Sequence, residues 1–171
     1  MDTIRVFVDT NIFPTDKLAR SFGDKKIKYV FSSVTEREMS GTDFLETLAG
    51  KGKVLETSVW DESCWNESVW GSEDTALEEI LEIISTGSFP VIGKRDFLTN
   101  GEIRQLRDAM ILETVIRDGY KIFLSNDKRA FIGNEKNNKR NILEDKFDIK
   151  IFTEEEYVNF TKKHVNNMFL K

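Results

Sequence analysis

Four acidic residues lie where a fold could bring their side chains together. Asp9 and Asp127 each follow a short apolar run with the pattern of a buried strand. Glu38 lies one turn into a helix expected after another such run, and Asp108 lies inside a long stretch with helical periodicity. Acids that end the strands of an open α/β sheet line the edge at which ligands bind. Because crowded carboxylates repel one another unless a cation lies between them, the set predicts a site for Mg²⁺ or Mn²⁺.

Each of these acids also has an ordinary structural interpretation when it is taken alone. Asp9 can be a turn residue, and Asp127 can be the N-cap of a helix that holds Phe131. Glu38 can be a solvated helix residue, and Asp108 can lie on an exposed stripe of its helix. The functional interpretation therefore depends on the order and the structural settings of all four acids together.

Chemistry that depends on histidine or cysteine has little support in this sequence. His164 is the only histidine, and it lies in a polar stretch of helical character. A serine or cysteine triad would have to use this residue. Cys64 is the only cysteine, so neither an internal disulfide nor a cysteine-rich zinc site is expected. Any chemistry is expected to rest on carboxylates.

The charge balance limits how the protein could bind a polyanion. The net charge is −5, from 25 basic and 30 acidic residues, which argues mildly against a protein that holds a nucleic acid backbone by its own charge. Metal ions that bridge carboxylates to phosphate would supply positive charge locally.

The composition is that of a soluble globular protein. Hydrophobic residues make up 39% of the chain and charged residues 32%, and no apolar run approaches the length of a membrane span. The short apolar stretch at residues 4–8 also differs from a secretory signal. We expect a cytoplasmic protein with no membrane association.

The elements that must position the four acids alternate between strands and helices. Short runs rich in β-branched and aromatic residues predict strands at residues 4–8, 27–31, 53–60, 120–124 and 148–152. Apolar residues at helical spacing and capping residues predict helices after residue 32, from about 72 to an end near Gly87, from about Thr99 or Asn100 to a stop at Gly119, and from Thr153 onward. Residues 135–140, rich in Asn and Lys, are expected to form a solvated loop. The alternation predicts an α/β fold, with a mainly parallel sheet flanked by helices, as a single domain over residues 1–171.

Several short motifs occur in an order that points to one family. They are Val-Phe-Val-Asp-Thr-Asn-Ile at 6–12, Ser-Val-Thr-Glu-Arg-Glu-Met at 33–39, Arg-Asp-Ala-Met-Ile at 107–111, Phe-Leu-Ser-Asn-Asp at 123–127 and Ile-Lys-Ile-Phe-Thr at 149–153. With these motifs the sequence resembles the PIN domain, a family of metal-dependent ribonucleases that includes toxins of bacterial toxin–antitoxin pairs. The resemblance implies a PIN-like three-layer fold.

The resemblance also implies a reaction and a set of roles. The expected reaction is hydrolysis of a phosphodiester, in RNA more than in DNA, by water activated on Mg²⁺ or Mn²⁺. Asp9 and Asp108 would be the principal metal ligands, and Glu38 and Asp127 would complete the coordination or act through water. Thr10, Asn11 and Ser125 would orient the ligands or the water. An antitoxin or another protein partner is a further implication, and a homodimer stays open.

The motifs leave out residues from about 53 to 97. This segment is interpreted as an insertion or a helical cap that borders the substrate groove or carries a partner interface. Trp60, Trp65 and Trp70 lie in it, and the last two stand in a polar, poorly periodic stretch. Aromatic residues at a surface commonly mark an interface, although core packing is the alternative for them.

Two other functions remain open at the level of the sequence. One is a PIN-like binding or scaffold module without turnover, in which the acids only cap helices and turns. The other is a metal-dependent phosphatase of the haloacid dehalogenase kind, which expects Asp-x-Asp where this chain has Asp9 followed by Asn11. For the nuclease, Asp9→Asn or Asp108→Asn should abolish cleavage and leave metal-free stability level or higher, because one of several crowded anions is removed.

Overall fold

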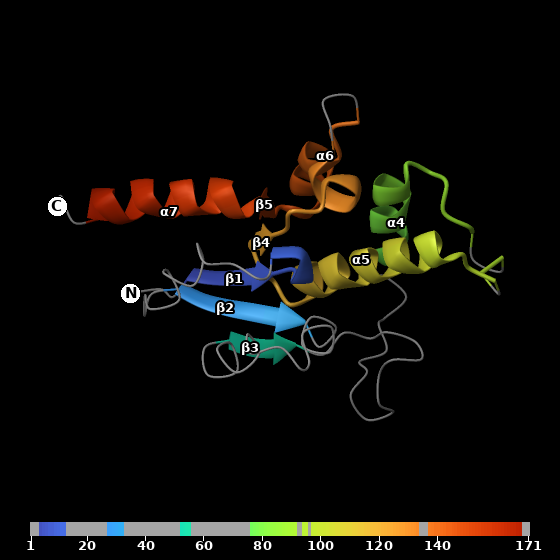
Figure 1. Ribbon diagram of the computed structural model, residues 1–171, viewed down its shortest axis with the longest axis horizontal. Helices are drawn as coiled ribbons and strands as arrows, with labels where there is room; N and C mark the ends of the chain where they lie inside the picture. Colours follow the sequence, from blue (N-terminus) through green and yellow to red (C-terminus); the bar gives the residue numbers. More distant parts are fainter. Residues whose placement is uncertain are drawn as a thin grey trace.

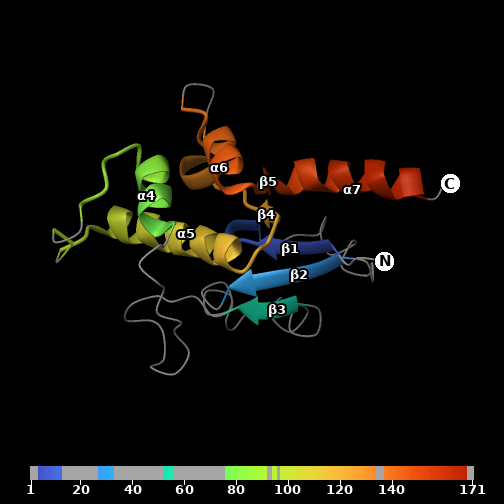
Figure 2. The same ribbon diagram turned by 180° about the vertical axis from the view of Figure 1, so that it is seen from behind.

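The computed structural model describes residues 4–12, 27–32, 52–55, 76–91, 94–95, 97–133 and 137–168. For residues 52–55 and 163–168 it describes the backbone alone. A five-stranded sheet in the order β3-β2-β1-β4-β5 forms its centre, and every neighbouring pair is parallel. The strands are β1 (Ile4–Val8), β2 (Ile27–Ser32), β3 (Gly52–Leu55), β4 (Ile122–Leu124) and β5 (Lys150–Phe152). The arrows of β1, β2 and β3 point the same way in Figures 1 and 2. The predicted parallel α/β sheet is therefore confirmed.

Helices cover both faces of this sheet (Figure 1). The helical elements are α4 (Leu77–Ser85), α5 (Asn100–Arg117), α6 (Lys139–Phe147), α7 (Glu154–Met168) and two short turns, η1 (Thr10–Ile12) and η2 (Lys128–Ile132). Because successive strand residues face opposite sides, β1 supplies Phe7 to one core and Val6 and Val8 to the other. The core with Phe7 contains residues of α4, α5, η2 and α6, and the core with Val6 and Val8 contains Tyr157 of α7. No helix in the described ranges is long and apolar enough to cross a membrane.

The boundaries of α5 and α4 follow from their end residues. Thr99 caps α5: its side chain accepts a hydrogen bond from Glu102 N at 3.3 Å, and Glu102 Oε2 accepts one from Thr99 N at 2.7 Å. Each of these bonds satisfies a backbone N–H that has no partner within the helix. α4 ends at Ser85, and Thr86 caps it in the left-handed region, followed by Gly87 with φ of 77°. The predicted start of the long helix at Thr99 or Asn100 is confirmed.

The solvated loop predicted at residues 135–140 is wrong for its last two residues. α6 begins at Lys139, whose side chain is only 7% exposed. α6 carries little apolar signal, because Leu143 is its one fully buried hydrophobic residue and Ile142 is 45% exposed. Asn138 precedes the helix in a left-handed conformation without a side-chain cap. Neither periodicity nor capping therefore marks this helix in the sequence.

Two elements of the segment 53–97, β3 and α4, belong to the sheet and to its core. β3 pairs with β2 in parallel, from Tyr29 opposite Gly52 to Ser32 opposite Leu55. α4 packs on α5, and its Ile80, Leu81 and Ile84 are buried in the same core as Phe7. The predicted strand at 53–60 is present up to Leu55, and residues 56–60 lie outside the described residues, as do Trp60, Trp65 and Trp70.

Candidate functional site

Asp9 lies at the carboxyl end of β1, where the sheet edge holds it in place. Its backbone N–H donates to Leu124 O at 2.9 Å, which ties it to the end of the neighbouring strand β4. Asp9 is only 3% exposed. Oδ1 accepts a hydrogen bond from Thr10 N at 2.7 Å, and Oδ2 accepts bonds from Asn11 Nδ2 at 2.5 Å and Ser125 Oγ at 2.8 Å. Three donors therefore fix the orientation of a buried carboxylate.

Ser125 joins the two strand ends through its hydroxyl group. The side chain is fully buried, and its backbone N–H donates to Phe152 O at 3.0 Å, at the end of β5. Oγ donates to Asp9 Oδ2 and accepts from Asn11 Nδ2 at 3.0 Å and from Asp127 N at 3.1 Å. One serine side chain thus connects the carboxylate of Asp9 to the backbone of Asp127.

A second connection runs from this edge to the start of α7. Asn126 N donates to Asn11 Oδ1 at 2.7 Å, and Asn126 Oδ1 accepts from Glu154 N at 3.2 Å. Asn11 is therefore held by both of its amide atoms, because its Nδ2 bonds to Asp9 and Ser125. Sequence reasoning missed Asn126, because an Asn after a strand is an ordinary turn residue.

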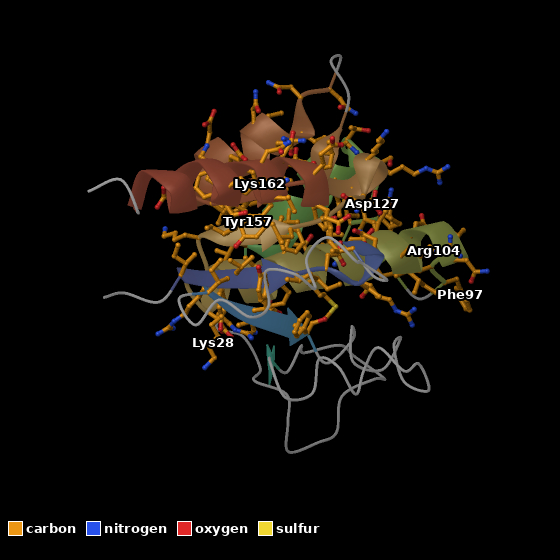
Figure 3. All side chains as sticks on the ribbon, turned by 60° about the vertical axis from the view of Figure 1, so that its left-hand side comes forward. Lys28, Phe97, Arg104, Asp127, Tyr157 and Lys162 are labelled. Atoms are coloured by element: carbon orange, nitrogen blue, oxygen red, sulfur yellow. The ribbon has the colours of Figure 1, made fainter. Side chains whose placement is uncertain are left out.

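Asp127 lies beyond β4 and caps η2. Its Oδ1 accepts hydrogen bonds from Arg129 N at 2.6 Å and Ala130 N at 2.8 Å. Its Oδ2 accepts no hydrogen bond within the described residues, so that oxygen is available to a ligand. Figure 3 shows Asp127 on the side toward which the strands run. The capping and the ligand interpretations of Asp127 are therefore compatible, because they use different oxygens.

Asp108 lies on the core-facing stripe of α5. Leu112 and Val115 follow it at four and seven residues, which is the spacing of one helix face, and both are fully buried. Asp108 itself is partly buried. Its side chain therefore lies where that stripe begins, whereas the exposed-stripe interpretation would place it on the opposite face.

The structure brings two of the four predicted acids together and leaves the set incomplete. Asp9 and Asp127 are joined through Ser125, and Glu38 lies outside the described residues. Among the residues that the structure describes, no group of three or more acidic, histidine or cysteine side chains is arranged to hold a metal ion. The donors at this edge are carboxylate, hydroxyl and amide oxygens, which suit Mg²⁺ or Mn²⁺ by type.

Basic side chains lie beside the edge. Lys128 and Arg129 directly follow Asp127 and are exposed, and Arg104 is exposed on α5. Figure 3 shows Arg104 on the same side of the molecule as Asp127. Lys139 is buried behind η2, where burial lowers the pKa of its ammonium group and the negative charge of Asp127 acts in the opposite direction. Sequence reasoning missed Lys139, and its polar surroundings in the sequence contain no signal for burial.

No family model matches the chain, and no curated protein matches it significantly. The resemblance to the PIN domain rests on the short motifs, and the family stays a prediction.

Proposed function

We propose that this protein is a metal-dependent nuclease with its active site at the carboxyl edge of β1 and β4. The observation that carries the proposal is the buried carboxylate of Asp9, oriented by Asn11 and Ser125 and joined through Ser125 to Asp127, which follows the neighbouring strand β4. A buried carboxylate whose orientation is fixed by hydrogen bonds from Asn11 and Ser125 is suited to hold a cation.

Each residue of the candidate site has a distinct part in the proposed reaction. Bound Mg²⁺ or Mn²⁺ would supply a water of lowered pKa and neutralise charge on the phosphoryl oxygens. Asp9 would hold the ion, with Asp127 contributing its uncapped Oδ2. Asn11 and Ser125 keep the Asp9 carboxylate in one orientation, so that little reorganisation is needed when the substrate arrives.

The remaining roles follow from the order of the motifs and from the resemblance. Asp108 would approach from α5 and Glu38 from the segment after β2, as the motif order implies. Lys128 and Arg129 would contact the phosphates that flank the cleaved bond. The choice of RNA over DNA, a cytoplasmic setting and an antitoxin or other protein partner follow from the resemblance alone.

A binding module without turnover is the second candidate. One observation favours it: both acids already have structural roles, since Asp127 caps η2 and Asp9 accepts three hydrogen bonds. The phosphatase alternative loses support, because Asn11 occupies the second acidic position and donates its amide to Asp9.

Cleavage of labelled single-stranded RNA with and without Mn²⁺ separates the candidates. Asp127→Asn is the informative variant, because Asn is as good an N-cap as Asp but lacks the charge. Loss of a hydrogen-bond partner of a metal ligand costs about 10–100-fold in metal affinity or activity, so loss of a ligand should cost at least that much. Asp145→Asn is the matched control, because Asp145 is exposed on α6 and makes no hydrogen bond or ion pair in the described part of the chain.

If the protein is a nuclease, we expect Mn²⁺-dependent cleavage by the wild type and by Asp145→Asn, and strongly reduced cleavage by Asp127→Asn. No Mn²⁺-dependent cleavage by the wild type, or equal cleavage by all three proteins, would overturn it. The binding module would then be the better description if labelled RNA is bound without being cut.

A further inference from the structure

Lys139 is a buried cation outside the candidate site. Its side chain is 7% exposed, and its ammonium group donates hydrogen bonds to Ile84 O and to Arg129 O, the second at 2.8 Å. Within the described residues no carboxylate lies at ion-pair distance from it. Two backbone carbonyls are therefore its direct partners.

These two carbonyls come from the ends of different elements. Ile84 lies in the last turn of α4, and Arg129 lies in η2, which ends at Ile132. Carbonyls at helix ends lack a partner within the helix and carry the negative end of the helix dipole, so they attract a cation. One ammonium group therefore joins α4 to η2.

Burying the ammonium group of Lys139 costs more free energy than burying an apolar side chain of the same length. Burial disfavours the charged form of Lys139, and its pKa is lowered for that reason, with Asp127 acting against the shift. Methionine would fill similar space without losing the hydration of a charge. A role that depends on the two hydrogen bonds explains why a lysine occupies the position.

η2 is the turn that presents Asp127, and it is closed at both of its ends. At the start, Asp127 Oδ1 accepts bonds from Arg129 N and Ala130 N. At the end, Gly133 has φ of 71° and donates its N–H to Lys128 O at 3.0 Å. A Cβ on Gly133 would lie 3.1 Å from Lys139 N and 3.3 Å from Lys139 Cβ. Lys139 therefore packs directly against the turn whose carbonyl it binds.

We propose that Lys139 is a positioning residue that joins η2 to α4 and thereby holds the Asp127 carboxylate at the sheet edge. The part of this inference that concerns metal rests on the proposed function. Lys139 does not touch the substrate, because its ammonium group is buried against two carbonyls.

Hydrogen exchange and Mn²⁺ binding test the inference on the full chain. Lys139→Met keeps the length of the side chain and removes both donated bonds, and Lys139→Gln replaces it if the Met variant does not fold. Val30→Ala is the control, because Val30 lies on β2 in the core that η2 shares, and its truncation destabilises the protein without removing a hydrogen bond of η2. Amide exchange is followed in η2 and, for comparison, in β4, and Mn²⁺ affinity is measured by calorimetry.

We expect exchange in η2 to be about tenfold faster in Lys139→Met while β4 is unchanged, with Mn²⁺ affinity about 10–100-fold lower. Val30→Ala should change η2 and β4 in parallel and bind Mn²⁺ as the wild type does. The inference would be overturned if η2 of Lys139→Met exchanged its amides at the wild-type rate, or if exchange in η2 and β4 became faster in parallel. If the wild type itself binds no Mn²⁺, the proposed function fails, and the exchange data alone decide the role of Lys139.

Discussion

Asp9 illustrates how one carboxylate can be part of the fold and of a reactive site at once. Both of its oxygens face donors, and one of those donors, Ser125, belongs to the neighbouring strand end. Its charge is therefore stabilised by oriented dipoles, with the hydrogen-bond direction set by the sheet itself. This changes the stability expected for substitutions at the position.

We expect Asp9→Asn to destabilise the metal-free protein, contrary to the expectation from crowded charges alone. An amide has one oxygen, so its NH₂ group must face either Thr10 N or Asn11 Nδ2, which are both donors. Asn11 cannot turn without losing its bond from Asn126 N. Leaving a buried polar group unsatisfied costs about 1–3 kcal/mol. Urea unfolding with a chelator present measures this, with Asp145→Asn as a neutral control; equal or greater stability of Asp9→Asn would mean that charge repulsion dominates.

The candidate site could be predicted in part from residue types. The sequence predicts one strand that ends before Asp9 and another that ends before residues 125–127. Parallel strands bring their carboxyl ends to the same edge of a sheet. The link through Asn126 and the burial of Lys139 could not be predicted, because they depend on which carbonyls and amides meet across distant parts of the chain. A polar residue in a polar stretch gives no indication of such a contact.

At the scale of elements, apolar periodicity decides what can be predicted. α4 buries Ile80, Leu81 and Ile84 on one face, and β4 is a short, largely buried run, so both were visible as patterns. α6 is different, since Leu143 is its one fully buried hydrophobic residue and several of its contacts with other elements are polar. Its Arg140 bonds to Glu156 of α7, with Nη1 at 2.9 Å from Oε1 and 3.0 Å from Oε2.

Glu156→Gln should weaken this α6–α7 connection in a pH-dependent way. Burial raises the pKa of Glu156, but hydrogen bonds from Arg140 and Thr153 outweigh it and hold the pKa below its ordinary value of 4.5. A depressed carboxyl pKa stabilises the fold above the unfolded value, and this contribution is lost as pH falls through the folded value. Because Glu156 is 44% exposed, we expect a loss of about 0.2–1 kcal/mol at pH 7.

The difference in the free energy of unfolding between the wild type and Glu156→Gln should therefore disappear in acid. Chemical unfolding from pH 7 down to below the folded pKa measures it, and Arg140→Met should show the same loss at pH 7 with little added in the double variant. A difference that persists unchanged in acid would mean that the ionised carboxylate is not the stabilising group.

At the scale of the whole molecule, the sheet has a separate core on each face. Phe7, Phe123 and Ile151 belong to the core with α4, α5 and α6, whereas Tyr29 and Leu124 belong to the core with Tyr157 of α7. Both cores contain residues of β1 and β4, so the position of the acids at the carboxyl ends of these strands depends on both cores. α4 is part of this arrangement although it lies between residues 53 and 97, the segment that the motifs leave out.

The packing of α4 leads to a prediction about cooperativity. Ile80 is fully buried in the core that also contains Phe7, Leu112 and Phe123. We expect Ile80→Ala to lower the free energy of unfolding of the entire domain by about 2–5 kcal/mol, because it removes buried volume from a shared core. Unfolding should stay a single transition, coincident by circular dichroism and by tyrosine and tryptophan fluorescence. Val91→Ala is the control, since Val91 is 62% exposed and its removal should change stability by less than about 0.5 kcal/mol. If α4 were a cap outside the catalytic unit, Ile80→Ala would instead release part of the helical signal in an early transition and leave the main transition, and any Mn²⁺-dependent cleavage, at wild-type values.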